Sequence, residues 1–73
     1  MQELLAPPPM KLTPRMTDVL LLVCEGKTTT EIARDLDLSP FTVKNYMERI
    51  FKRLGAQDRV QAVGTALRSG LIH

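Results

Sequence analysis

The sequence predicts an all-α fold, a four-helix bundle that contains a helix-turn-helix. Four segments each combine a helix-start signal with apolar residues at intervals of three and four, and no segment shows the alternation typical of a strand. Apolar residues make up 44% of the 73 residues and aromatic residues only 4%, so the core must consist of aliphatic side chains. Such cores suit helix packing, and a chain of this length supports one small domain.

Residues 1–11 read as a flexible, proline-rich linker. Their "APPP" run favours polyproline II and resists both helix and sheet. Segments of this kind commonly join two domains. We therefore expect the folded domain at residues 12–73.

The first helix is expected between Thr13 and Gly26. Thr13 suits the N-cap, Pro14 suits the first helical position, and Gly26 suits the end of the helix. The expected inward stripe is Val19, Leu20, Val23 and Cys24, widened by Leu21 and Leu22.

The second helix is predicted by a capping box, in which Thr28 is followed three residues later by Glu31. It must end near Leu36, because the residue before a proline resists helical geometry and Ser39 precedes Pro40. About three residues then separate the second and third helices, the spacing of a helix-turn-helix.

The third helix lies in "SPFTVKNYMERIFKRLG", residues 39–55, and its residues fall into two stripes. The apolar stripe is Val43, Met47, Ile50, Phe51 and Leu54. The polar stripe is Lys44, Asn45, Glu48, Arg49 and Lys52. This separation predicts that one face of the helix packs in the core and the other is free.

The fourth helix is expected between Asp58, a good N-cap, and Gly70, a good residue to follow the C-cap. Val60, Val63 and Leu67 are expected to face the core.

The charge pattern indicates a polyanionic partner. The net charge of +2 is small, but the third helix carries only one acidic residue, Glu48, between positions 44 and 53. The same stretch carries four basic residues, Lys44, Arg49, Lys52 and Arg53. Lys44 suits guanine, Asn45 adenine and Glu48 cytosine, whereas Lys52 is better placed for phosphate. The hydroxyl and N–H groups of Thr28, Thr29 and Thr30 suit phosphate at a helix start, with simple capping as the alternative.

Other classes of function find little support. One cysteine, Cys24, and one histidine, His73, form no disulfide, zinc site or nucleophile pair, so we expect no enzyme, no metal and no cofactor. No apolar run approaches the roughly 20 residues that span a bilayer, and a cytoplasmic location without membrane contact is expected. The open alternative to DNA binding is a helical adaptor that docks a receiver domain or a sigma factor.

Several motifs in register resemble one known family. "LTPR", "TTTEIARDLDLSPFTVKNYMERIFKRLG" and "AQDRVQAV" are similar to the LuxR-type (GerE-type) helix-turn-helix DNA-binding domain, over residues 12–72. That domain ends many NarL/FixJ-type response regulators and quorum-sensing receptors. The resemblance implies a sequence-specific transcription regulator, bound to double-stranded DNA as a homodimer, with its third helix in the major groove. It also implies an N-terminal receiver or ligand-binding domain.

The resemblance assigns roles to individual residues. It implies base-facing positions at Lys44, Asn45, Glu48 and Arg49. It implies phosphate contacts at Thr28, Thr29, Thr30, Thr42, Tyr46, Lys52 and Arg59. It implies a dimer surface on the fourth helix at Ala62, Gly64, Thr65 and Ala66. This chain departs from the family pattern at Met16, usually Glu, and at Tyr46, often His.

Overall fold

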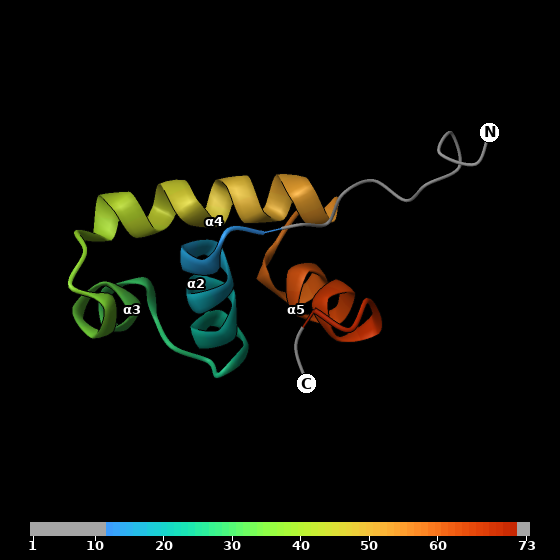
Figure 1. The fold of residues 1–73 in the computed structure, drawn as a ribbon, viewed down its shortest axis with the longest axis horizontal. Helices are drawn as coiled ribbons and strands as arrows, with labels where there is room; N and C mark the ends of the chain where they lie inside the picture. Colours follow the sequence, from blue (N-terminus) through green and yellow to red (C-terminus); the bar gives the residue numbers. More distant parts are fainter. Residues whose placement is uncertain (1–11, 72–73) are drawn as a thin grey trace.

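The computed structural model describes residues 12–71, and this range forms four α-helices and no strand (Figure 1). They are α2 (Pro14–Cys24), α3 (Thr29–Leu36), α4 (Pro40–Leu54) and α5 (Arg59–Arg68). The predicted all-α fold with four helices is confirmed. The predicted linker, residues 1–11, lies outside the described residues.

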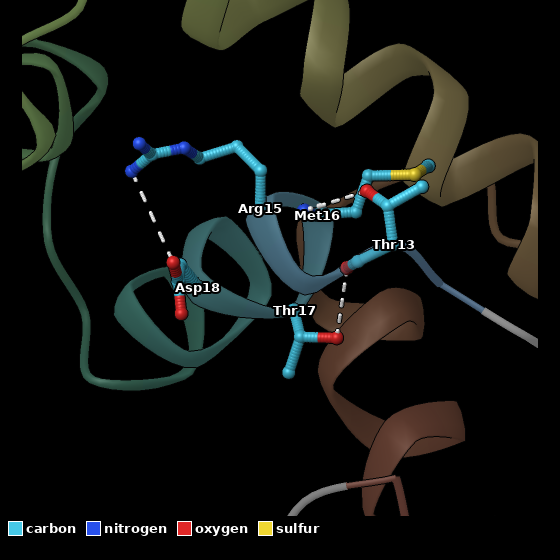
Figure 2. Close-up of polar contacts among 5 residues, drawn as sticks. All are labelled: Thr13, Arg15, Met16, Thr17 and Asp18. Carbon is cyan, nitrogen blue, oxygen red and sulfur yellow. Dashed lines mark hydrogen bonds and ion pairs between the residues drawn. The ribbon is translucent and has the colours of Figure 1, made fainter.

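The first turn of α2 is fixed by its own side chains (Figure 2). The N–H of Met16 donates to Thr13 Oγ1 at 3.2 Å, and the hydroxyl of Thr17 donates to the Thr13 carbonyl at 3.1 Å. Arg15 and Asp18 form an ion pair at 3.9 Å on the solvent side. Thr13 is therefore the N-cap, as predicted, and the adjacent Met16 side chain is buried.

The turn between α3 and α4 consists of residues 37–39, as the spacing predicts. Asp37 adopts a left-handed conformation with φ of 58°, which an Asp side chain tolerates better than most. Its N–H donates to the Arg34 carbonyl, and the N–H of Leu38 donates to the Ala33 carbonyl at 2.8 Å. These two bonds close α3 with a Schellman motif and set the direction in which α4 leaves.

The core is aliphatic and draws on all four helices. Its buried members are Met16, Val19, Leu20, Val23, Ile32, Ala33, Val43, Ile50, Leu54, Ala62 and Ala66. The predicted inward stripe of α2 is confirmed at Val19, Leu20 and Val23. Cys24 and Leu22 are half-buried against this core, whereas Leu21 is exposed.

The orientation predicted for α5 is wrong. Val60 is 80% exposed and Leu67 is 55% exposed, and only Val63 of the three residues expected in the core packs against it. The buried residues of α5 are Ala62 and Ala66. Because small side chains let helix backbones approach closely, α5 packs against α2 and α4 through its two alanines. Val60 and Leu67 are left outside.

Candidate nucleic-acid interface

Helix α4 lies along one side of the molecule, with α2, α3 and α5 all packed on the other side (Figure 1). Local signals set its ends, because Ser39 Oγ accepts from the Thr42 N–H at 3.0 Å and Gly55 turns the chain with φ of 67°. Val43, Ile50 and Leu54 anchor the inner face. A continuous outer face, about 22 Å long at 1.5 Å per residue, is thereby left to solvent.

The outer face of α4 carries the five residues predicted from the polar stripe. Lys44, Asn45, Glu48, Arg49 and Lys52 are all exposed. Within residues 12–71, the structure forms no ion pair to Lys44, Arg49 or Lys52. No carboxylate in that range thus neutralises their positive charges by close contact, even though Glu48 lies one turn from both lysines. An exposed row of cations and amides of this kind suits an anionic surface.

Shallow hollows flank this face and group the predicted residues. The first is lined by Thr42, Asn45, Tyr46 and Arg49. The second is lined by Thr29, Lys44, Met47, Glu48 and Phe51, and the third by Glu48, Arg49 and Lys52. Predicted base-facing and predicted phosphate-contacting residues therefore lie side by side, on both flanks of α4.

The start of α3 lies against the second of these flanks. Thr29 Oγ1 lies 3.9 Å from Met47 Sδ, toward which its hydroxyl donates, and this contact ties the first turn of α3 to α4. In that turn the N–H groups of Thr29 and Thr30 have no carbonyl partner within the helix, because none precedes them at the required spacing. The helix dipole adds positive potential at the same point, which favours an anion.

Thr28 and Glu31 form the predicted capping box. The Glu31 N–H donates to Thr28 Oγ1 at 3.1 Å, and the Thr28 N–H donates to Glu31 Oε1 at 2.9 Å. The hydrogen bond from the Thr28 backbone holds the pKa of Glu31 below its usual range, helped by the charges of Lys27 and Arg34. The Thr28 hydroxyl accepts from the Glu31 N–H and also hydrogen-bonds the Glu31 carboxylate, so its proton is directed within the box.

The remaining predicted phosphate contacts differ in setting. Thr42 Oγ1 accepts from the Ser39 hydroxyl at 2.9 Å, and Tyr46 packs half-buried against the core. Arg59 Nη1 donates to the carbonyl of Lys27 at 2.8 Å, across 32 residues of sequence. Arg59 therefore holds the loop that leads into α3, a structural role that the sequence does not reveal.

Two of the four residues of the predicted dimer surface, Ala62 and Ala66, are buried within the protomer. Ala62 and Ala66 have no exposed area, so their side chains contact the protomer core and are not available to a partner. Gly64 and Thr65 are half-buried. Val60 and Leu67 are exposed, and the half-buried Gly64 lies between them on the same outer face of α5, because the three residues are spaced by four and three.

The sequence analysis also missed Phe41. It belongs to neither stripe of the third helix, and the structure leaves it 72% exposed. For Phe41, Val60 and Leu67, the available signal is their helical spacing relative to the buried residues.

Residues 10–66 match the family model of bacterial regulatory proteins of the luxR type. The chain belongs to the luxR family. It is 39% identical over 59 residues to the transcriptional regulatory protein DesR of Bacillus subtilis, covering 81% of this chain and 30% of DesR. It is 39% identical over 62 residues to the transcriptional activator RamA of Corynebacterium glutamicum, covering 85% of this chain and 22% of RamA.

Solved structures agree with this assignment. The fold superposes on the Vibrio cholerae VqmA dimer, a LuxR-type receptor solved without its target DNA, with a TM-score of 0.81 and 36% identity over 84% of this chain and 28% of that one. It superposes on VqmA of a phage, in its complex with DPO, with a TM-score of 0.80 and 35% identity over 94% of this chain and 32% of that one. This chain thus spans about a third or less of these proteins.

Membership shows what kind of domain this is. Residues 10–66 form a LuxR-type helix-turn-helix domain of transcription regulators, and DNA binding is the activity that this family implies. Such a domain is not typically enzymatic. None of the helices in residues 12–71 has the length and apolar character needed to cross a lipid bilayer.

Proposed function

We propose that this domain binds double-stranded DNA sequence-specifically as a homodimer, with α4 of each protomer in a major groove. The observation that carries the proposal is the outer face of α4, which no other helix covers and whose Lys44, Arg49 and Lys52 form no ion pair within residues 12–71. The major groove is wide enough to admit an α-helix, and buried aliphatic residues hold this one rigidly from behind.

Base reading is assigned to Lys44, Asn45, Glu48 and Arg49. Lysine and arginine donate to guanine O6 and N7, asparagine pairs with the adenine edge, and glutamate accepts from cytosine N4. These four residues occupy successive turns of one exposed face, so together they meet several consecutive base pairs.

The proposed phosphate contacts flank these base-reading residues. At the start of α3, Thr29 and Thr30 offer N–H and hydroxyl groups, and Thr28 offers a hydroxyl once it turns away from Glu31. Lys52 offers a cation further along α4. Thr42, Tyr46 and Arg59 are further phosphate contacts, each a half-buried residue with a donor group in its side chain. These contacts fix the register of the protein on the duplex but carry no sequence information.

The dimer contact is assigned to the exposed stripe of α5, namely Val60, Gly64 and Leu67, with Thr65 at its border. An apolar stripe with a glycine at its centre lets a second copy of the helix approach closely. A dimer with two-fold symmetry then meets two half-sites related by the same symmetry.

The wider setting follows from the family. The relatives are longer proteins, so we propose that an N-terminal receiver or ligand-binding domain completes the regulator. A cytoplasmic location, where the chromosome of a bacterium lies, is part of the same proposal.

The salt dependence of binding tests the electrostatic part. If a dimer neutralises about five phosphates, the logarithm of the association constant should fall with the logarithm of salt concentration at a slope of about −4 to −5. Lys44→Ala should cost about 1–3 kcal/mol and relax the preference at one base pair, whereas Lys52→Ala should weaken all duplexes alike and flatten the slope. Fluorescence anisotropy with a selected duplex and a scrambled duplex measures both.

A negative DNA-binding result would favour the second candidate function, a helical adaptor. If micromolar protein gives no mobility shift with random duplex at low salt, DNA binding is contradicted. That outcome would favour an adaptor that docks a receiver domain or a sigma factor.

A further inference from the structure

Phe41 is an exposed aromatic residue in the first turn of α4. Its side chain is 72% exposed, although Phe is among the side chains that proteins most often bury. It does not belong to the buried cluster or to the partly buried residues packed against it. Phe41 therefore adds little to the core, and its contribution must be sought at the surface.

Around the helix axis, Phe41 points directly away from the core, although along the axis it lies in the first turn. Residues 41, 45, 48 and 52 follow one another at steps of four, three and four, so Phe41, Asn45, Glu48 and Lys52 lie along one line of α4. The buried residues Val43, Ile50 and Leu54 lie on the opposite side. Phe41 is thus the apolar first member of a row whose other members are polar.

We infer that Phe41 reads the C5-methyl group of a thymine at the edge of each half-site. This inference rests on the proposed function, because it assumes that α4 lies in the major groove. The thymine methyl is the apolar group that a base pair presents there, and Phe is among the side chains that contact it. Recognition helices touch base edges mainly with their N-terminal residues, which is where Phe41 lies.

The chemistry of the ring separates this role from those of its neighbours. A phenyl ring has neither a hydrogen-bond donor nor an acceptor to offer, so it holds no phosphate and reads no polar base edge. Its contact with a methyl group removes apolar area from water on both sides. Phe41 therefore extends the reading of Asn45 and Glu48 by one base pair and selects for the methyl group alone.

Replacement of thymine by deoxyuridine tests the inference, since it removes the methyl group and keeps the pairing. Duplexes selected from a random pool are resynthesised with deoxyuridine at one symmetric pair of positions at a time. For the unmodified protein, one position should lose about fourfold in affinity per half-site, the factor expected for burying one methyl group. The Phe41→Ala protein should bind the thymine and deoxyuridine duplexes equally at that position.

Two further variants make the test specific. Phe41→Leu keeps an apolar side chain and should retain part of the thymine preference. Lys52→Ala should weaken both duplexes by the same factor and leave the preference intact. Equal urea midpoints for Phe41→Ala and the unmodified chain should show that the exposed ring is not needed for folding.

The outcomes distinguish the two levels of the argument. If selection enriches a site but Phe41→Ala and the unmodified protein lose equally at every deoxyuridine position, the thymine contact is overturned while DNA binding stands. A selected site without a preferred A·T pair overturns it as well. If selection enriches no sequence, the proposed function itself fails.

Discussion

Ala33 occupies a position in α3 where the size of the side chain matters. It is 3% exposed and belongs to the same buried cluster as Val43 and Ile50 of α4. A longer side chain there has no space without moving α3 away from α4, because protein cores are close-packed. The small residue therefore helps set the geometry of the helix-turn-helix.

We predict that Ala33→Leu lowers the free energy of unfolding by about 1–3 kcal/mol, the usual cost of overpacking. Arg34→Leu is the matched control, because the next residue is exposed and should change stability by no more than about 0.5 kcal/mol. Urea unfolding followed by circular dichroism measures both. Equal losses for the two variants would show that the site tolerates a larger residue.

At the scale of single residues, the capping positions were predictable and the exposed apolar residues were not. Thr13, Thr28, Ser39 and Asp58 each accept from a backbone N–H three residues ahead, a contact that depends on local sequence alone. Phe41 differs, because its apolar side chain favours burial while its helical spacing places it on the polar stripe, with Asn45 and Glu48.

Helix α3 owes part of its stability to a charged capping box. The Thr28 N–H keeps Glu31 ionised in the fold, so the pKa of Glu31 is lowered in the folded state. A lowered folded pKa stabilises the protein fully above the unfolded pKa of about 4.3, and the stabilisation is lost as the pH falls through that value toward the folded pKa.

We therefore predict that Glu31→Gln is less stable than the unmodified chain at pH 6 and that the difference shrinks toward pH 3. The amide keeps an acceptor but cannot carry the charge that the helix N-terminus favours. Urea midpoints at several pH values measure the difference, in which the titration of the other carboxylates cancels. Two parallel pH curves would contradict the role given to the carboxylate.

At the scale of helices, the sequence predicted that the four helices exist and where they begin and end. It did not predict which side of α5 is buried. This helix has two apolar sets, one of large residues at Val60 and Leu67 and one of small residues at Ala62 and Ala66. Hydrophobicity favours burying the large set, yet the close approach of α5 to α2 and α4 selects the small set. Only the tertiary arrangement decides between the two.

At the scale of the whole molecule, the fold leaves two sets of residues at the surface, the polar stripe of α4 and the Val60, Gly64 and Leu67 stripe of α5. The basic pattern of the third helix predicted the first set, because its polar and apolar residues separate cleanly. The stripe of Val60, Gly64 and Leu67 could not be predicted in the same way, because it lies outside only as a consequence of the burial of Ala62 and Ala66.

The α5 stripe makes a prediction about assembly. Leu67→Glu should leave the urea midpoint unchanged, since the side chain is 55% exposed, but should weaken self-association at least about tenfold, because a charge replaces apolar area buried between two copies. Binding to a duplex with two half-sites should fall, while binding to a single half-site should not. Sedimentation velocity and mobility shifts measure the two effects.

A substitution at Gly64 can distinguish two explanations for this glycine: that it allows close contact in a dimer, or that it is a tolerated defect in the helix. A Cβ at this position would lie 3.2 Å from Arg68 Nη1, the movable end of an exposed side chain, so Gly64→Ala fits the protomer. Alanine should stabilise the monomer by about 0.5–1 kcal/mol through helix propensity. If two copies of α5 meet at Gly64, the added methyl group also holds their backbones apart, so self-association weakens while the monomer gains stability. A gain in both quantities would mean that the dimer contact lies elsewhere on the molecule.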